Sequence, residues 1–214
     1  MAMLEDKVKD QVKKELAGLK EEVKLIVFTQ ELECQYCREN RILTEEVASL
    51  SDKIGIEVYN FAIDKEKVEE YKVDKIPAIV VMGEKDYGIR FYGLPGGYEF
   101  VSLIEAIKVV SARDSGLAPE SRELVKKLTR PVHIQVFVTL TCPYCSRAVE
   151  LAHKLALESD LIRSDMVEAA EFPQLVNKYN VMAVPKIVIN GEIQFEGALP
   201  EPAFLEQVMK ANQM

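Results

Sequence analysis

Apolar residues recur along the chain with helical spacing in some segments and as short continuous runs, typical of buried strands, in others. Leu4, Val8, Val12, Leu16 and Leu19 follow helical spacing within a highly charged segment, which predicts an amphipathic helix over residues 3–19. The apolar run over residues 23–28 predicts a buried strand. The pattern then predicts a helix through Ile42, Leu43, Val47 and Leu50, a strand over 54–63, a short helix over 65–71, strands over 78–82 and 87–92, and a helix over 99–112.

The second half of the chain repeats this order of elements. The pattern predicts a helix over residues 120–129, a strand over 132–138, a helix after residue 142, a strand over 165–170, a short helix over 173–179, two strands joined by the Asn190-Gly191 turn, and a helix over 202–211. Between the halves, Gly116 and Pro119 are typical of a junction. We therefore expect an α/β protein of two units, residues 1–115 and 116–214, each of a usual domain size.

The repeat includes all four cysteines of the chain. Cys34-Gln35-Tyr36-Cys37 and Cys142-Pro143-Tyr144-Cys145 are 108 positions apart, and Pro77 and Pro185 are separated by the same 108 positions. Each Cys-x-x-Cys motif therefore has a proline at an identical distance downstream. With no cysteine left for structural bridges, the pattern predicts catalytic thiol–disulfide exchange in a reducing compartment.

The position of each motif between a strand and a helix explains why it suits this chemistry. A cysteine at a helix N-terminus meets unpaired N–H groups and the positive end of the helix dipole, which stabilise a thiolate. The pKa of such thiols falls to about 3.5–7.5. We expect Cys34 and Cys142 to attack substrate disulfides, and Cys37 and Cys145 to resolve the mixed disulfides. Because the residues inside the two motifs differ, we also expect unequal reduction potentials.

Ile76-Pro77 and Val184-Pro185 each stand just before a predicted strand. Together with the Cys pairs they resemble the thioredoxin fold, in which a cis Ile/Val-Pro bond lies against the Cys-x-x-Cys motif and offers backbone groups to a bound peptide. The resemblance implies two tandem thioredoxin-fold units, each a central mixed β-sheet flanked by helices. It also implies a set of substrate-binding residues, namely Ile76, Pro77, Val184 and Pro185, to which we add the motif tyrosines Tyr36 and Tyr144.

Over nearly its whole length the chain more closely resembles the glutaredoxin-like protein disulfide oxidoreductases of hyperthermophilic archaea and bacteria, which are similar to protein disulfide isomerase. Both Cys motifs and the segments 91–95 and 181–189 carry this resemblance. It implies a cytoplasmic enzyme, without a bound cofactor, that reduces, oxidises or isomerises disulfides of protein substrates. It also implies an NADPH-dependent flavoprotein similar to thioredoxin reductase as the partner that supplies electrons.

One departure from thioredoxin concerns the proton acceptor. Thioredoxin has a buried Asp six positions before the first Cys of its motif, where this chain has Phe28 and Val136. Glu168, within an apolar run, is a candidate replacement, because a carboxylate buried near Cys145 has a raised pKa and can accept its proton. The alternative is that Glu168 lies on the solvent side of its strand.

Charge and spacing bear on other classes of function. The chain has 27 basic and 35 acidic residues, a net charge of −8, which argues against nucleic acid or an anionic membrane as a partner. It has no apolar run of about 18 residues, and its first twenty residues are too charged for a signal peptide. A shared zinc site would need the pairs much closer in sequence than the 105 positions between Cys37 and Cys142. Three alternatives to a disulfide oxidoreductase remain. The first is a glutaredoxin-like protein that binds an iron–sulfur cluster, which would be coloured when purified. The others are an electron relay to a peroxiredoxin and a redox-inert scaffold, which would have lost one Cys pair.

Overall fold

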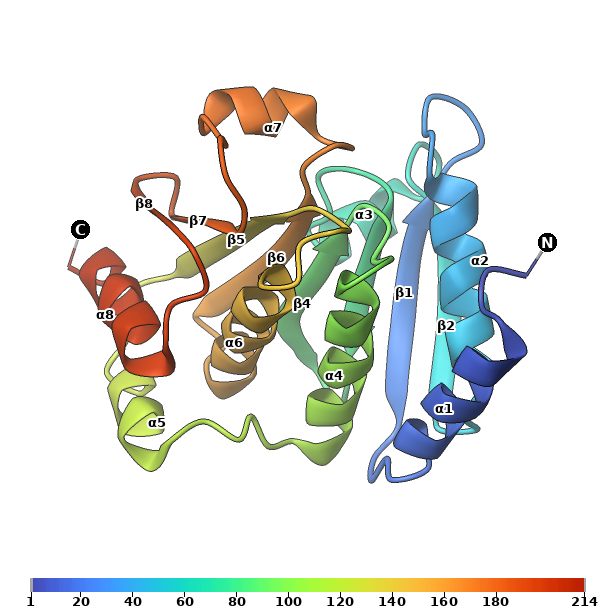
Figure 1. The fold of residues 1–214 in the computed structure, drawn as a ribbon, viewed down its shortest axis with the longest axis horizontal. Coiled ribbons are helices and arrows are strands. Elements are labelled where there is room, and N and C mark those ends of the chain that lie inside the picture. Colours follow the sequence, from blue (N-terminus) through green and yellow to red (C-terminus); the bar gives the residue numbers. More distant parts are fainter. Residues whose placement is uncertain (1, 214) are drawn as a thin grey trace.

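The structure, a computed structural model, describes residues 2–213 and shows the same succession of elements in each half of the chain (Figure 1). The first half contains α1 (Asp6–Leu16), β1 (Val23–Thr29), α2 (Cys37–Ala48), β2 (Ile54–Asn60), α3 (Lys65–Glu70), β3 (Ala78–Met82), β4 (Asp86–Tyr92) and α4 (Glu99–Ala112). The second half contains α5 (Pro119–Val125), β5 (Val132–Val138), α6 (Cys145–Glu158), β6 (Ile162–Glu168), α7 (Pro173–Lys178), β7 (Lys186–Ile189), β8 (Ile193–Glu196) and α8 (Glu201–Ala211).

The predicted order of elements is confirmed in both halves, and the bounds of α4, β5 and β7 agree with the prediction. The predicted start of β6 is wrong, because the strand begins at Ile162 rather than Asp165. The polar residues Arg163, Ser164 and Asp165 interrupt the apolar pattern from which the start of the strand was predicted. Asp165 is fully buried, and it stays within the strand because Arg163 and His133 donate to it at 2.9 and 2.6 Å.

All eight strands join in one sheet with the order β2-β1-β3-β4-β6-β5-β7-β8. Within each unit the first two strands pair in parallel and the remaining pairs are antiparallel. The two units meet edge to edge, because β4 pairs with β6 in parallel from Ile89–Ser164 to Tyr92–Val167. The chain is thus an α/β protein with two tandem thioredoxin-fold units in a single sheet. The predicted boundary at residues 115 and 116 falls between α4 and α5 and stays a prediction.

Hydrophobic side chains cover both faces of this sheet. One layer includes residues of α1, α2, α4, α5, α6 and α8, and the other is formed with residues in and next to α3 and α7. On the first face α4 and α6 pack side by side at the junction of the two units (Figure 1). This arrangement places the N-termini of α4 and α6 close together, above the carboxyl ends of β4, β5 and β6.

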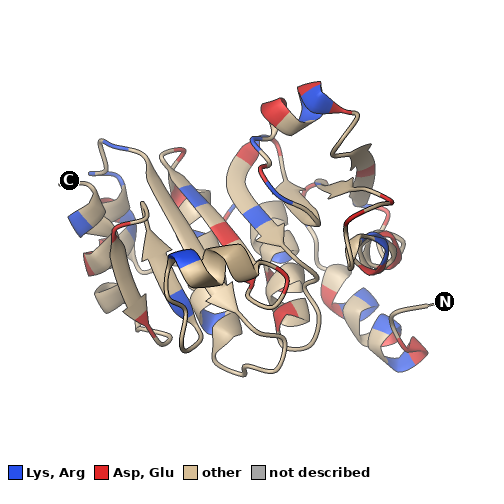
Figure 2. Cartoon of the chain, turned by 90° about the horizontal axis from the view of Figure 1, so that it is seen from above, with Lys and Arg blue, Asp and Glu red and all other residues tan. Residues whose placement is uncertain are grey.

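The remaining surface carries both signs of charge. Figure 2 shows Lys and Arg interspersed with Asp and Glu along the ribbon. Several pairs of opposite charge lie one helical turn apart, such as Arg41 with Glu45 and Lys210 with Glu206. Among residues 2–213, none of the helices combines the length and the apolar character needed to cross a membrane.

Candidate active sites

The first Cys pair lies in the loop between β1 and α2. Cys34 and Cys37 form a disulfide with their Cα atoms 5.4 Å apart. Helix α2 begins at Cys37, so Cys34 lies just ahead of the first helical turn rather than in it. Cys37 is buried with 1% of its surface exposed, whereas Cys34 is partly exposed. An incoming sulfur can therefore reach Cys34 and not Cys37.

The second Cys pair has the same local geometry in a more enclosed setting. Cys142 and Cys145 form a disulfide with a Cα separation of 5.5 Å, and α6 begins at Cys145. The Cys145 N–H donates to the Cys142 carbonyl at 3.4 Å, which closes the turn that leads into the helix. Cys145 is fully buried and Cys142 is 8% exposed, so Cys142 is the more accessible of the two sulfurs.

The two predicted proline loops have matching backbone geometry. The Ile76-Pro77 and Val184-Pro185 peptide bonds are both cis. The carbonyl oxygen of each proline accepts an N–H from the glycine that closes the following hairpin, Gly93 at 3.0 Å and Gly197 at 2.8 Å. In the second unit the Val184 carbonyl oxygen lies 3.8 Å from Cys142 Sγ, so this loop borders the sulfur.

The motif tyrosines differ in their surroundings. The Tyr36 hydroxyl accepts a hydrogen bond from the Gln35 side chain at 3.2 Å. Tyr144 is 63% exposed, and Met182, three residues before Pro185, is 81% exposed. The second site therefore presents apolar surface beside its buried sulfur. Two assignments stay predictions. One is the catalytic role of the four cysteines, and the other is the substrate-binding role of the two prolines, the residues before them and the motif tyrosines.

Glu168 lies inside the protein. It is 4% exposed and ends β6 beside Val138, the last residue of β5 before the second Cys loop. Met166, on the same side of the strand, belongs to the core layer that contains Cys145. Burial raises the pKa of Glu168, although its Oε2 accepts the Glu171 N–H at 2.9 Å. Its surroundings are thus those of a carboxyl group that can hold a proton, and its role as a proton acceptor stays a prediction.

Two further acids near the second site, the buried Glu99 and the half-buried Glu171, were missed by the sequence reasoning. Glu99, in the first turn of α4, is fully buried, and burial raises its pKa to about 7. Its Oε2 accepts the Ser102 hydroxyl at 2.8 Å, while Oε1 has no partner within the described residues. Burial also raises the pKa of Glu171 to about 7. An acid in the first turn of a helix is common in proteins, so nothing in the sequence marked Glu99 as buried.

A loop of the first unit forms part of the second site. The Tyr98 N–H donates to the Leu140 carbonyl at 3.0 Å, two residues before Cys142. Gly97 has a φ of 54°, and a Cβ atom there would overlap the Leu140 carbonyl oxygen. Tyr98 itself is 50% exposed, so this backbone contact lies next to an exposed aromatic residue of the first unit. The repeat alone could not reveal this contact, because it treats the two units as equivalent and separate.

One peptide group next to this loop connects the two units. The Gly93 carbonyl oxygen accepts from the Asn40 side chain at 3.0 Å, one helical turn after Cys37. The N–H of the same peptide group, on Leu94, donates to Glu171 at 2.7 Å. The first turn of α2 and the turn after β6 are therefore both held by hydrogen bonds to a single peptide group of the chain.

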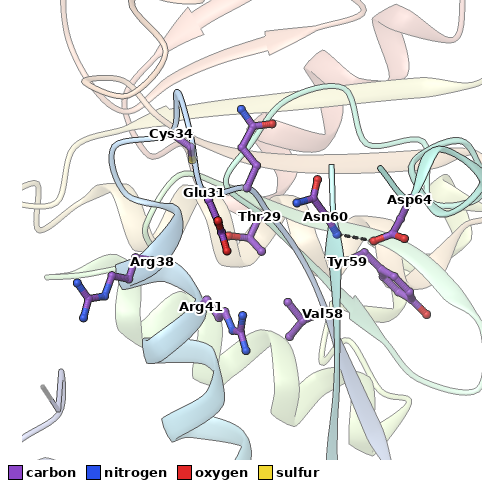
Figure 3. Close-up of a pocket in the computed structure, with 10 residues that line it drawn as sticks. Thr29, Glu31, Cys34, Arg38, Arg41, Val58, Tyr59, Asn60 and Asp64 are labelled. Carbon is purple, nitrogen blue, oxygen red and sulfur yellow. Dashed lines mark hydrogen bonds between the residues drawn. The ribbon is translucent and has the colours of Figure 1, made fainter. Parts of the chain in front are cut away.

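A pocket of about 520 Å³ opens beside Cys34 (Figure 3). Its walls come from the end of β1, the first turns of α2, the end of β2 and the start of α3: Thr29, Gln30, Glu31, Cys34, Arg38, Arg41, Val58, Tyr59, Asn60 and Asp64. Four of these residues are charged. Nowhere within residues 2–213 do three or more Cys, His, Asp or Glu side chains form a group that could bind a metal ion.

Comparison with known proteins identifies relatives over the whole length of the chain. Residues 132–210 match the family described as "Thioredoxin domain". The structure is similar to that of a protein disulfide oxidoreductase from Aeropyrum pernix k1, with a TM-score of 0.94, 32% sequence identity, and coverage of 100% of this chain and 95% of the other. It is also similar to the NTD_N/C domain of alkylhydroperoxide reductase AhpF from Enterococcus faecalis, with a TM-score of 0.89, 26% identity, and coverage of 96% and 99%.

Curated relatives are longer proteins that match this chain over part of their length. A Bacillus subtilis protein named "NADH dehydrogenase" is 32% identical over 152 residues, which are 70% of this chain and 27% of the relative. A Xanthomonas campestris protein, named as a component of alkyl hydroperoxide reductase, is 30% identical over 172 residues, or 80% of this chain and 30% of the relative. The chain thus spans less than a third of these two proteins.

Proposed function

The chain belongs to the family of protein disulfide oxidoreductases, and from this membership we propose that it catalyses thiol–disulfide exchange on protein substrates through both of its Cys pairs. The observation that carries the proposal is the difference in exposure within each pair. In both pairs a buried sulfur starts a helix, and a more accessible sulfur stands ahead of it. This is the arrangement that separates an attacking sulfur from a resolving one.

In the reducing direction, the thiolate of Cys34 or Cys142 attacks one sulfur of a substrate disulfide. A bond forms between the cysteine and that sulfur, and the other substrate sulfur leaves as a thiolate. Cys37 or Cys145, which a protein substrate cannot reach, then attacks the cysteine sulfur of this mixed disulfide and releases the second substrate sulfur. Oxidation follows the same steps in reverse, and isomerisation needs only the first step and its reversal at another substrate sulfur.

The electrons require a donor, for which we propose a flavoprotein that resembles thioredoxin reductase and uses NADPH or NADH. The names of the relatives support a pyridine nucleotide and a reductase as neighbours in the electron pathway. A second candidate function is relay of electrons to a peroxide-reducing protein, favoured by the similarity to components of alkyl hydroperoxide reductase.

We also propose residues 1–115 and 116–214 as the two units. We further propose a cytoplasmic location, because all four cysteines belong to the redox pairs.

Reduction of insulin by the full chain, with dithiothreitol as electron donor, tests the proposal. Insulin should be reduced by the wild type, by a Cys142→Ser/Cys145→Ser variant through the first site, and by a Cys34→Ser/Cys37→Ser variant through the second. A variant with all four substitutions is the control and should be inactive. If the wild type were no faster than this control, thiol–disulfide exchange would be refuted as the activity. If one double variant matched the wild type and the other matched the control, only one pair would be active.

A further inference from the structure

The segment that leads to the cis-proline of the first site is held by the second unit. Arg163 of β6 donates through Nη1 to the Lys72 carbonyl oxygen at 2.9 Å. Lys72 follows α3 and begins the segment 72–76, which runs to Pro77. The pairing of β4 with β6 joins the two units at this place, so a residue of one unit can contact the substrate-binding loop of the other.

A second contact of the same guanidinium holds the other end of this segment. Arg163 Nη2 donates to the Tyr92 hydroxyl at 2.7 Å. The Lys75 ammonium lies 3.6 Å from the centre of the Tyr92 ring, and only 11% of the Lys75 side chain is exposed. The segment is therefore fixed directly at Lys72 and, through the tyrosine, at Lys75.

Arg163 is itself held in one orientation by a buried acid. Its Nε and Nη2 donate to the two carboxylate oxygens of Asp165 at 2.9 and 3.3 Å. Asp165 is fully buried and also accepts from His133 at 2.6 Å. A planar guanidinium paired with both oxygens of a fixed carboxylate cannot rotate without breaking these hydrogen bonds. Its remaining N–H groups are thus directed at the first unit in advance of any substrate.

The second unit holds the equivalent segment with a residue of its own. At the repeat offset of 108, Lys72 matches Asn180, and both adopt positive φ, of 52° and 49°. The Asn180 carbonyl oxygen accepts from Lys186 Nζ at 3.3 Å, and Lys186 immediately follows Pro185. The same turn therefore has a cationic donor on its carbonyl oxygen in both units.

The first unit does not carry a copy of the donor that the second unit uses. Lys186 is matched by Ala78, whose side chain cannot donate a hydrogen bond, and Arg163 is matched by Gly55. The Lys72 carbonyl oxygen instead receives its hydrogen bond from the neighbouring unit. Arg163 thus takes the place that Lys186 has in the second unit.

We propose that Arg163 is a positioning residue of the first active site, which holds the segment 72–76 and so fixes the backbone of Ile76 and Pro77 along which a protein substrate binds. This rests on the proposed thiol–disulfide exchange and gives the second unit a part in substrate binding at the first site. The hydrogen bonds of Arg163 go to Lys72, Tyr92 and Asp165 rather than to a Cys loop. Its effect therefore falls on substrate binding and not on the sulfur chemistry.

The test uses two full-length chains that each keep one Cys pair. The first-site chain carries Cys142→Ser/Cys145→Ser, and the second-site chain carries Cys34→Ser/Cys37→Ser. Insulin reduction gives KM and kcat for a substrate that uses the proline loop. The rate at which dithiothreitol reduces the remaining Cys pair reports the sulfur chemistry alone.

Arg163→Lys is the test variant, because Lys keeps the positive charge beside Asp165 but lacks the fork that reaches Lys72 and Tyr92 together. Lys186→Met is the matched variant for the second site, because it removes the ammonium group and keeps an unbranched side chain. Lys75→Met releases the other end of the segment and leaves the buried pair of Arg163 and Asp165 intact.

In the first-site chain, Arg163→Lys should raise KM for insulin by about tenfold, the effect of losing a charge-assisted hydrogen bond, with kcat and the dithiothreitol rate unchanged. In the second-site chain it should change none of these values. Lys186→Met should give the reverse result. Hydrogen–deuterium exchange should become faster over residues 71–77 with Arg163→Lys and over residues 179–185 with Lys186→Met.

An equal rise of KM in both chains would overturn the proposal, since it would show a general loss of stability. An unchanged KM in the first-site chain would also overturn it, even if residues 71–77 exchanged faster, because substrate binding would then not depend on this segment. A slower reaction with dithiothreitol would place the effect at the sulfurs and refute a positioning role.

The remaining outcomes separate this inference from the proposed function. If Arg163→Lys did not fold, Lys75→Met would decide: a raised KM in the first-site chain supports the proposal, and an unchanged KM refutes it. If the parent first-site chain reduces insulin and its Arg163→Lys variant does so with the same KM, only the positioning role fails. If the parent first-site chain reduces no insulin, the proposed function of that site fails, and the role of Arg163 fails with it.

Discussion

Replacing the buried Glu99 with Gln should remove a large pH dependence of folding stability. The carboxyl group is fully buried, and burial raises its pKa from 4.5 to about 7 in the folded protein. Between these two values the unfolded chain releases its proton while the folded chain keeps it, so stability falls as the pH rises from about 4.5 to about 7. At about 1.4 kcal/mol per pH unit, the ionised carboxylate destabilises the folded state by about 3 kcal/mol above pH 7.

The assay is urea unfolding of the oxidised protein at pH 5 and at pH 8, followed by circular dichroism. Gln keeps the size of Glu and can still accept the Ser102 hydroxyl, which Oε2 of Glu99 accepts at 2.8 Å. Any constant cost of its amide group is the same at both pH values and cancels in the comparison. Relative to the wild type, Glu99→Gln should gain about 2–3 kcal/mol more at pH 8 than at pH 5.

Glu120→Gln is the control, because Glu120 is exposed in the first turn of α5 and its replacement changes the charge equally. Its effect on stability should be the same at both pH values. If Glu99→Gln also changed stability equally at pH 5 and pH 8, the buried carboxyl group would not be protonated near neutrality, and the reasoning from burial would be wrong.

Three further changes test other parts of the structure. Asp165→Asn should destabilise the protein by about 3–5 kcal/mol in urea unfolding, because it leaves the Arg163 guanidinium without its buried counter-charge; a loss below about 1 kcal/mol would contradict this. Gly97→Ala should speed alkylation of the reduced second Cys pair, because its methyl group would push the Leu140 carbonyl and the loop of the largely buried Cys142 away. Gly116→Ala, also at positive φ but with open space around it, should leave the rate unchanged; equal effects would show that backbone strain alone is responsible. Glu168→Gln should lower insulin reduction by the second-site chain about a hundredfold at pH 7 and leave the first-site chain unchanged, and an unaltered rate would exclude Glu168 as a proton acceptor.

The order of elements could be predicted because local signals agree with the fold. The continuous apolar run from Val132 to Val138 fits a strand buried on both faces, and β5 has these bounds. Asn190 and Gly191 both adopt positive φ, of 51° and 77°, as their hairpin turn requires. The Cys pairs and their prolines were found because the repeat aligns three positions of each unit, two cysteines and a proline, which is a stronger signal than any of them alone.

The contacts between the units could not be predicted, because they depend on which edge strands meet. Nothing in Ile89–Tyr92 distinguishes a strand that ends a sheet from one that pairs with β6 of the other unit. The same holds for Tyr98, whose N–H bonds to Leu140 across a long sequence separation. Glu99 and Glu168 were hard to place for a related reason, because an acidic residue in a sequence suggests solvent until the packing around it is known.

The pairing of β4 with β6 explains how two copies of one motif can become different sites. It brings Gly93 against the second unit, where a Cβ atom at this glycine would lie 2.6 Å from the Glu168 Cβ. The matching Gly197 follows β8 at the outer edge of the sheet, and a Cβ there would meet nothing within 4 Å in the described part of the chain. The second site therefore has a neighbouring unit whose Gly97 and Tyr98 contact the Leu140 carbonyl just ahead of Cys142. The first site adjoins the free edge formed by β2, where side chains can remain charged and in contact with water. Joining the units at one edge of the sheet is thus sufficient to make the cysteine environments unequal, even where the repeated sequences agree.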